Sequence, residues 1–544
     1  MISLYFHTLR YLKLKQIYGR ILFNILKPRI NHIIRPKLAS QKNNFCKPIS
    51  NKISLKKKNI FCFLNKCGSL SKIGWNNDKK NYSKLWRYNQ HYFDDLIATN
   101  SSKRKKQHIN LLKLWITENP VGKGVGWDSY PTSLRIVNWI KWSLSKNTLT
   151  DPLLNSLAIQ ARWLDKRIEW HILGNHLLTN AKALVFAGIF FSGKEANNWL
   201  LKGLKIFNDE LNEQILDDGG NFERSPMYHS IILEDLLDLI NISRTSKKNI
   251  LRKFEKRLIK FVIKMFEWLE IMNHPDGEIS YFNDSALGIA PNLHDLKLYA
   301  DRLRINYKSL KFKKIVNLSD SGYIRMTSKD AVVLLDTAPI GPDYLPGHAH
   351  ADTLSFEFSL FGQRLFVNTG TSNYENNSIR QYERSTEAHN TVVVNNKNSS
   401  EVWGSFRVAR RAKPFNLHTR KSNDESFVSC AHDGYKYLRG KPIHGRSWKL
   451  SNSSLIIEDY IKGFYKNAFA YIHLHPLVKI YKIDKNNWNL KIKNFPQITM
   501  NIIGVSAKLE KFYYATEFGK KFKSQRLKIK VNKKRLCVEI SWKK

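Results

Sequence analysis

The sequence predicts an α+β, multidomain fold in which an N-terminal α/α toroid is followed by a C-terminal antiparallel β-sandwich. From about residue 86 to residue 307, apolar residues recur with the period of a helix. From Gly322 onward, β-branched and alternating segments stand between turn signals. A chain of 544 residues is also too long for one ordinary core. We place a basic N-terminal segment at 1–60, the toroid at 61–315 and the sandwich at 316–544.

The N-terminal segment is basic, and no acidic residue occurs between Met1 and Asn77. Residues 1–26 are apolar but are interrupted by basic residues and lack a small-residue cleavage site, so we expect neither a secretory signal nor a transmembrane span. Two interpretations stay open: a basic amphipathic helix on an anionic membrane surface, or a helix packed on the main body. We expect a cytoplasmic protein, membrane-associated in the first case, with the periplasm as the alternative.

The middle of the chain predicts a series of helices joined by short polar loops. Short loops between helices of similar length imply antiparallel hairpins, and eight or more helices fit a toroid better than a four-helix bundle. Polar aromatic residues gather in these loops, where binding sites tend to lie on a rigid helical scaffold. The expected helices cover 103–118, 133–146, 152–170, 176–191, 195–211, 228–242, 250–272 and 293–303.

The last part of the chain predicts short strands that pack as a sandwich of antiparallel sheets. One predicted hairpin turns at Phe361-Gly362-Gln363 and is preceded by His348, His350 and Asp352. Alternate side chains of a strand share a face, so these three could form a ligand or proton-transfer cluster. A polar loop is the other interpretation. Strands are expected at 331–335, 354–360, 391–394, 455–458 and 470–475.

The charge balance favours an acidic partner. The chain has 90 Lys and Arg against 45 Asp and Glu, for a formal net charge of +45. Such a field suits nucleic acid, an acidic membrane leaflet or an acidic polysaccharide, although compositional bias explains the magnitude equally well. The sequence carries no zinc-finger, RNA-recognition or helix-turn-helix signature, so nucleic acid is not expected. Nothing in the sequence predicts the oligomeric state.

The five cysteines are few and scattered. They suggest no disulfide framework, and Cys62 and Cys67 lack the second pair that a zinc site of this kind needs. We therefore expect folding without disulfides, as in a reducing compartment.

Several unusual motifs occur in one order along nearly the whole chain, and together they resemble the heparinase II/III-like polysaccharide lyases. The similarity is closest to members found with bacterial envelope-polysaccharide biosynthesis. The motifs are Leu-Arg-Tyr-Leu-Lys-Leu-Lys-Gln-Ile-Tyr-Gly-Arg at 9–20, Trp-Arg-Tyr-Asn-Gln-His-Tyr-Phe at 86–93, Gly-Asn-His-Leu-Leu-Thr-Asn at 174–180, Glu-Arg-Ser-Pro-Met-Tyr-His at 223–229, His-Pro-Asp-Gly-Glu-Ile-Ser at 274–280, Gly-His-Ala-His-Ala-Asp at 347–352, Asn-Thr-Gly-Thr at 368–371 and Arg-Ser-Thr-Glu-Ala-His-Asn-Thr at 384–391.

The resemblance implies a toroid and a β-sandwich with a cleft between them, and β-elimination at a uronic acid residue of an acidic glycan. Asn175, which we also read as a helix N-cap, and His176 would neutralise the uronate carboxylate so that the C5 proton can leave. The roles of base and acid fall on a Tyr and a His in the family, and the matching positions are Tyr228 and His348. Tyr374 matches a second active-site tyrosine of some relatives. The pKa of a catalytic tyrosine would need lowering, which cationic neighbours could do.

The family also implies a divalent ion, usually zinc, held by two histidines and an aspartate. The matching positions are His350, His389 and Asn368, so a neutral amide replaces the carboxylate. An amide is a poor zinc ligand. The alternatives are an absent ion, a weaker site, compensation by Asp352, or a hydrogen-bonded structural knot without metal.

Three functions are compared at this stage. A lyase acting on an acidic polysaccharide is preferred. A non-catalytic relative that binds acidic glycan in capsule or O-antigen production is the alternative, and a hydrolase would need facing carboxylates from among Asp217, Asp218 and Asp284. Glu223 could order the Tyr228 loop through Arg224, and Arg384 and Arg407 are weaker candidates for binding substrate carboxylates.

Overall fold

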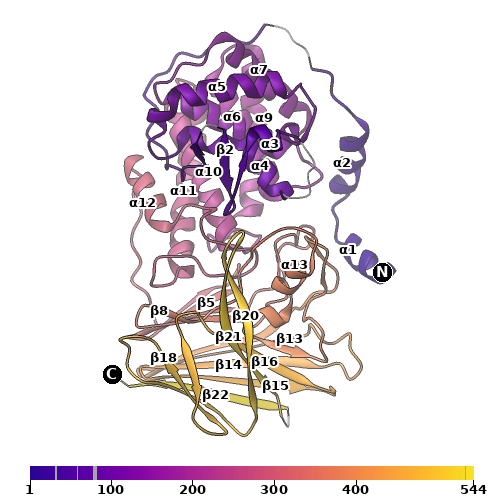
Figure 1. Ribbon diagram of the computed structural model, residues 1–544, viewed down its shortest axis with the longest axis vertical. Coiled ribbons are helices and arrows are strands. Elements are labelled where there is room, and N and C mark those ends of the chain that lie inside the picture. The colour runs from indigo at the N-terminus through magenta and orange to yellow at the C-terminus, as the bar shows by residue number, and fades with distance from the viewer. Residues whose placement is uncertain (31–33, 58, 77–81, 533, 544) are drawn as a thin grey trace.

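The fold is α+β, with helices in the first part of the chain and antiparallel sheets in the second. The computed structural model describes residues 1–30, 34–57, 59–76, 82–532 and 534–543. Most of the helices lie at one end of the longest axis and most of the strands at the other, although β2 lies among the helices and α13 among the sheets (Figure 1). The predicted succession of helices followed by antiparallel strands is therefore confirmed.

Every helix predicted between residues 103 and 303 is present, with ends that shift by a few residues. The 250–272 helix has the predicted bounds, whereas the one expected at 152–170 stops at Lys166. The helices are α1 (Ile2–Leu9), α2 (Leu14–Ile25), α3 (Leu70–Ile73), α4 (Lys84–Tyr92), α5 (Lys105–Glu118), α6 (Ser129–Leu144), α7 (Asp151–Lys166), α8 (Gly174–Phe190), α9 (Lys194–Gln214), α10 (Pro226–Arg244), α11 (Ile250–Met272), α12 (Leu293–Arg302) and α13 (Ser378–Glu383).

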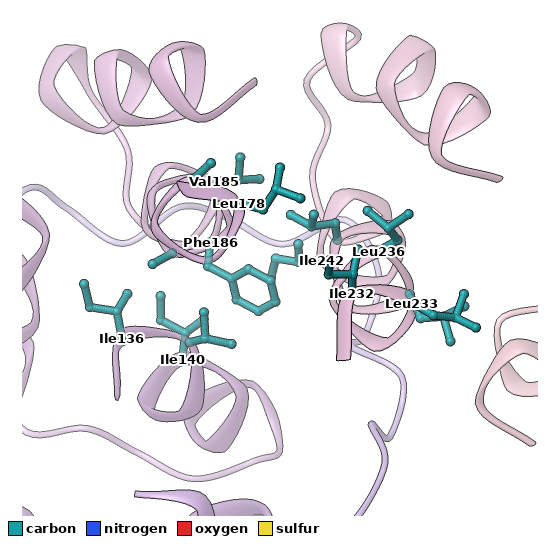
Figure 2. Close-up of a cluster of buried hydrophobic side chains, with 14 of the residues drawn as sticks. Ile136, Ile140, Leu178, Val185, Phe186, Ile232, Leu233, Leu236 and Ile242 are labelled. Atoms are coloured by element: carbon teal, nitrogen blue, oxygen red, sulfur yellow. The ribbon is translucent and has the colours of Figure 1, made fainter. Parts of the chain in front are cut away.

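Helix α8 lies at the centre of the helical part. It is buried on nearly every face, which is why its sequence is apolar all round rather than amphipathic. Its Phe186 side chain points into the space between α6 and α10, as Figure 2 shows, while Val185 faces Gly203 of α9. A helix held on all sides is a rigid support, and its first turn carries two of the predicted catalytic residues.

The sheets are antiparallel throughout the described strands. A five-stranded sheet has the order β4-β5-β6-β7-β8. A separate eight-stranded sheet has the order β12-β13-β14-β15-β22-β19-β18-β17. A four-stranded sheet of order β20-β21-β16-β9, a β10-β11 pair and the N-terminal β1-β2-β3 sheet complete the set. In the β7-β8 hairpin Leu360 pairs with Gln363, so the predicted turn is confirmed.

The strands have the following bounds: β1 (Leu55–Lys57), β2 (Ile60–Phe63), β3 (Lys66–Ser69), β4 (Ile315–Leu318), β5 (Tyr323–Thr327), β6 (Ala331–Asp336), β7 (Phe356–Leu360), β8 (Gln363–Phe366), β9 (Val392–Val394), β10 (Val402–Trp403), β11 (Arg407–Val408), β12 (Pro414–Lys421), β13 (Glu425–His432), β14 (Ile443–Ser451), β15 (Ser454–Lys462), β16 (Ala468–His473), β17 (Lys479–Lys482), β18 (Asn487–Lys491), β19 (Ile498–Ile502), β20 (Ala507–Glu517), β21 (Lys520–Lys530) and β22 (Arg535–Trp542).

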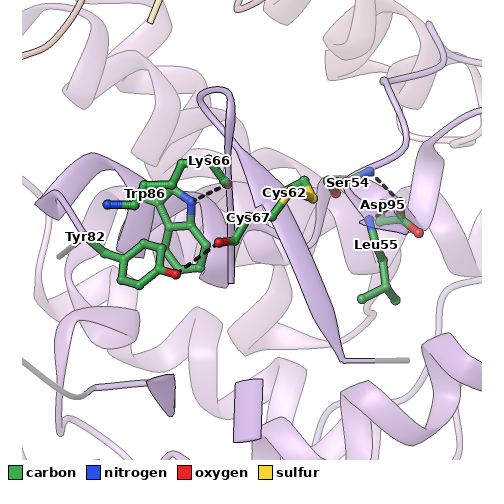
Figure 3. The surroundings of a disulfide bond; sticks show 8 residues. All are labelled: Ser54, Leu55, Cys62, Lys66, Cys67, Tyr82, Trp86 and Asp95. Atoms are coloured by element: carbon green, nitrogen blue, oxygen red, sulfur yellow. Dashed lines mark hydrogen bonds between the residues drawn. A yellow bond between two sulfur atoms is a disulfide. The ribbon is translucent and has the colours of Figure 1, made fainter. Parts of the chain in front are cut away.

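A disulfide joins Cys62 to Cys67, and the expectation of folding without disulfides is wrong for this pair. The two cysteines face each other across the β2-β3 hairpin, whose turn residues Leu64 and Asn65 have positive φ (Figure 3). A two-residue turn of this kind brings the residues on either side into register. The spacing in the sequence did not reveal this, because the hairpin itself was not predicted.

The first 26 residues form two helices rather than one. Both α1 and α2 lie at the outer edge of the molecule, to the right in Figure 1. Among the described helices, none has the length and apolar character needed to cross a membrane.

Candidate active site

Three of the predicted catalytic residues meet directly where the helices adjoin the sheets. The rings of Tyr228 and His348 are stacked with centroids 3.9 Å apart. The hydroxyl of Tyr228 lies 3.2 Å from the hydroxyl of Tyr374. Each of the three side chains is only partly buried, so a ligand can reach the group.

Helix α10 places Tyr228 at this point. The helix begins at Pro226, and the hydroxyl of Ser225 caps it by accepting a hydrogen bond from the Tyr228 backbone N–H. The tyrosine is thus in the first turn, with its ring directed towards His348. The predicted lowering of its pKa is not found, because burial and the neighbouring Tyr374 raise the pKa of Tyr228 well above its ordinary value. Tyr228 therefore keeps its proton in the resting protein.

Asn175 lies in the first turn of α8 and is joined to the group by Glu223. Its backbone N–H and its side-chain amide both donate to Oε1 of Glu223, at 3.1 and 3.0 Å. The N-cap role that we expected for Asn175 is wrong, because α8 begins at Gly174 and Leu173 occupies the cap position. The carboxylate of Glu223 instead accepts the backbone N–H of Asn175 at this helix end.

The turn into α8 depends on Gly174. This residue has a φ of +54°, and a Cβ atom here would come within 2.3 Å of Leu345 Cδ2. A side chain would therefore displace either the turn or the neighbouring loop. The glycine of the Gly-Asn-His motif is thus required by the geometry of the turn, whereas Asn175 and His176 supply its chemistry.

His176 follows Asn175 and is paired with a buried acid. Its Nδ1 is 3.2 Å from Oε1 of Glu169, and its ring lies 4.5 Å from that of Tyr130. Burial lowers the pKa of His176, but the Glu169 carboxylate outweighs this effect and the pKa is raised overall. Asn180 holds the second oxygen of Glu169 at 3.1 Å. The arrangement favours an imidazolium cation at the first turn of α8.

His348 is held between two carboxylates. Its Nδ1 lies 2.9 Å from Oδ2 of Asp284, and its Nε2 lies 3.6 Å from Oε2 of Glu223. Burial would raise the pKa of Asp284, but the Arg380 guanidinium and the imidazoles of His348 and His350 hold it well below its ordinary value. An ionised Asp284 can accept the Nδ1–H of His348, which orients the ring and turns Nε2 towards Glu223.

Sequence reasoning missed the roles of Asp284 and Arg380. Asp284 is fully buried and binds both guanidinium nitrogens of Arg380, one of them at 2.7 Å. It also accepts from His350 Nε2 at 2.8 Å. Asp284 lies in the loop between α11 and α12 and Arg380 lies in α13, nearly a hundred residues later. No periodicity or spacing connects two such positions, so only the tertiary structure shows the pair.

The predicted cluster of His348, His350 and Asp352 on one strand face is wrong in its geometry. The strand β7 begins only at Phe356, and residues 346–353 form turns, so side chains do not alternate there. The imidazoles of His348 and His350 each contact the Asp284 carboxylate, whereas Asp352 accepts the backbone N–H of Asn283 at 3.2 Å.

The proposed metal ligands form a small buried group of neutral side chains. His350 Nδ1 lies 3.2 Å from His389 Nε2, and burial lowers the pKa of both imidazoles, that of His350 to about 4. The side-chain oxygen of Asn368 accepts the Asn390 N–H at 3.3 Å. Within the described ranges, no three His, Cys, Asp or Glu side chains are placed to hold a metal ion. Without a carboxylate, these residues do not fit zinc.

The remaining candidates do not take the roles considered for them. Glu223 does not act through Arg224, whose guanidinium donates to the carbonyls of Ser321 and Asp320. Buried Arg384 donates to the Ala349 and Gly404 carbonyls, and Arg407 stacks on Trp403. Asp217 is exposed, Asp218 accepts from Ser321, and Asp284 is paired with Arg380, so the carboxylates considered for hydrolysis do not face one another.

Family comparison covers almost the whole chain. The model described as heparinase II/III N-terminus matches residues 27–307, and the model described as heparinase II/III-like, C-terminal, matches residues 313–543. The chain belongs to the heparinase II/III-like family. The resemblance of the motifs is thereby confirmed.

Individual relatives of this family member are known by sequence and structure. The heparin-sulfate lyase of Bacteroides stercoris is 28% identical over 325 residues, which are 56% of this chain and 45% of that protein. That of Pedobacter heparinus is 24% identical over 333 residues, covering 55% and 50%. The chain thus spans about half the length of the curated relatives it matches.

Two crystal structures share the fold. Heparinase III aligns with a TM-score of 0.70 at 19% identity, over 86% of this chain and 79% of that one. A mutant of the Pedobacter heparinus heparan sulfate lyase HepC aligns with a TM-score of 0.63, also at 19% identity, over 97% and 87%.

Proposed function

We propose that this heparinase II/III-like protein is a lyase that cleaves a uronate-containing acidic polysaccharide by β-elimination, in bacterial envelope-polysaccharide metabolism. The observation that carries the proposal is the stacked pair of Tyr228 and His348, with His348 oriented by an ionised Asp284. The similarity to heparin-sulfate lyases supports the same reaction class. At a finer level, we take the helices to form an α/α toroid, and the sheets to form a β-sandwich that closes the cleft.

Neutralisation of the uronate carboxylate is assigned to His176 and Asn175. The C5 proton is acidic enough to remove only when the negative charge that develops on the carboxylate is stabilised. The raised pKa of His176 keeps its imidazole charged, and Glu169 fixes its orientation. The Asn175 amide stands beside it on the same helix turn and adds a neutral donor.

Proton transfer is divided between His348 and Tyr228. The neutral form of His348, which this step requires, removes the C5 proton through Nε2, while Asp284 beside Nδ1 stabilises the imidazolium that results. The C4–O4 bond then breaks as the C4–C5 double bond forms, and O4 takes the proton of the Tyr228 hydroxyl. The raised pKa of Tyr228 suits a group that begins the cycle protonated. Tyr374 lies within hydrogen-bond distance of that hydroxyl and can return a proton to it.

We take His350 and His389 to form a hydrogen-bonded knot, while the Asn368 side-chain oxygen accepts the Asn390 N–H. Starting from ionised Asp284, the His350 Nε2–H donates to the carboxylate and the His389 Nε2–H donates to His350 Nδ1. These two hydrogen bonds satisfy the facing nitrogens of His350 and His389 without an ion, and they hold the Asp284 carboxylate in place. No step of the proposed reaction requires a metal.

The experiment uses a panel of glycans and follows the near-ultraviolet absorbance of unsaturated uronate ends. Heparan sulfate, chondroitin and hyaluronan provide different uronate linkages, and dextran is a control without uronate. We expect absorbance to grow with at least one acidic glycan and to be lost in Tyr228→Phe and His348→Ala. New reducing ends without absorbance would indicate a hydrolase. Binding of acidic glycan without any product would support the non-catalytic alternative.

A further inference from the structure

The two N-terminal helices present apolar stripes to solvent. In each helix the exposed apolar residues recur at intervals of three and four, so they lie along one face. Their exposed fractions exceed one half, which is unusual for large apolar residues gathered in one area of a protein surface. They are Ile2 (87%), Phe6 (63%) and Leu9 (53%) in α1, and Leu14 (83%), Tyr18 (65%), Ile21 (52%) and Ile25 (70%) in α2.

The opposite faces of these helices attach them to the body. In α1 the ring of Tyr5 packs edge-on against Trp403 at 4.9 Å, and Thr8 accepts the Trp403 indole N–H at 3.1 Å. In α2 Gln16 is buried and donates to the Tyr344 carbonyl at 3.2 Å. These contacts fix the rotation of both helices. The apolar stripes consequently face away from the protein, the reverse of an ordinary surface helix.

Phe23 anchors the second half of α2. Its ring lies 4.2 Å from that of His171, and the guanidinium of Arg167 stacks over it while donating to its carbonyl. The one large aromatic side chain of α2 that faces inward is therefore held between two residues of the body. Tyr18 lies on the other side of the helix and is exposed to solvent.

The charge around the stripes selects the partner. Exposed basic residues flank them, and this part of the sequence contains no acid before Asp78. A second copy of the chain would bring an identical basic face and would be repelled. The partner must bury the apolar stripes and also carry negative charge, and a membrane surface with anionic lipids does both. The flanking residues are Arg10, Arg20, Lys27 and Arg29, whereas Lys15 is paired with Glu210 of the body at 3.3 Å.

We propose that α1 and α2 bind the surface of a membrane containing anionic lipids, with the two stripes in the interface and the flanking basic residues at the headgroups. The proposal does not depend on the catalytic assignment, because none of these residues contributes to the candidate active site.

The test is co-sedimentation of the full-length protein with vesicles of phosphatidylcholine alone or mixed with phosphatidylglycerol. We expect binding to the mixed vesicles that weakens as salt is raised. The variant Tyr18→Asp/Ile21→Asp should bind at least about tenfold more weakly, because it places two charges in the interface. The matched control is Leu477→Asp/Ile483→Asp, which alters two exposed apolar residues of the sheet part and should bind like the wild type.

A second variant and two further measurements keep the result interpretable. Arg20→Gln/Lys27→Gln leaves the apolar stripe intact and should lose part of the salt dependence. Thermal unfolding of each variant checks the fold, and sedimentation velocity without vesicles reports the oligomeric state. The proposal is overturned by absence of binding to mixed vesicles, by equal binding of the Tyr18→Asp/Ile21→Asp variant, or by a wild-type dimer that this variant converts to monomer.

Discussion

Oδ2 of Asp284 lies 2.9 Å from Nδ1 of His348, and the same carboxylate is bound on its other side by Arg380. The aspartate therefore links the proposed base to a buried cation. It also accepts from His350, so one side chain orients both histidines of the Gly-His-Ala-His motif. This relationship leads to the first prediction.

Replacing Asp284 with asparagine should affect stability and activity together. The change leaves the buried Arg380 without its counter-charge, which costs about 3–5 kcal/mol of the free energy of unfolding. It also removes the acceptor that fixes the His348 tautomer, so kcat should fall even at temperatures where the variant is folded. Denaturant unfolding and the lyase assay measure the two effects. Asp217→Asn is the control at an exposed carboxylate, and equal stability of the two variants would contradict the account.

The pH dependence of substrate binding should follow His176. Its pKa is raised in the folded protein, so the charged form and the stability it contributes are fully present below the unfolded value of about 6.5 and are lost as pH rises through the folded pKa. Glu169→Gln removes the carboxylate that raises this pKa, and the rise in KM should then begin at lower pH. Glu267→Gln, at an exposed position, should leave the profile unchanged. If the pH profile of KM in Glu169→Gln were identical to that of the wild type, His176 would not be the group that binds the substrate carboxylate.

The knot of His350 and His389, with neutral Asn368 in place of a carboxylate, predicts a protein without stoichiometric zinc. Restoring a carboxylate by Asn368→Asp should create a third zinc ligand beside the paired nitrogens of His350 and His389. Metal analysis after dialysis against zinc should then show higher zinc content in this variant than in the wild type. Stoichiometric zinc in the wild type, lost together with activity on chelation, would contradict the knot.

The Cys62–Cys67 bond should contribute modestly to stability, because it closes a short loop. Chain-entropy reasoning gives about 2 kcal/mol for a loop of this size. Cys62→Ser/Cys67→Ser should lower the free energy of unfolding by that order with little change in kcat, because the hairpin reaches the stacked pair only indirectly. Its turn residue Asn65 donates to the Phe518 carbonyl at 2.9 Å, and the Phe518 ring packs edge-on against Tyr374. Cys46→Ser is the control at an unpaired cysteine. A drop in kcat as large as that in His348→Ala would contradict this separation.

The helices and the main motifs could be predicted from the sequence because their signals are local. Periodicity placed α11 correctly, and the cap residues Ser225 and Pro226 mark the start of α10. The meeting of Asp284 with His348 and Arg380 could not be predicted, because it depends on two loops and a short helix folded together. The alternation argument for His348 and His350 failed for a related reason: turns, rather than a strand, carry them.

The central claim is that His348 removes the C5 proton and Tyr228 protonates the leaving oxygen. Incubation of the variants with an acidic oligosaccharide in deuterated water, followed by mass spectrometry, tests it directly. We predict that Tyr228→Phe incorporates deuterium at C5 without cleavage, because its base is intact, and that His348→Ala neither exchanges nor cleaves. Exchange that persists in His348→Ala and is lost in Tyr228→Phe would contradict the account and assign the base to the tyrosine.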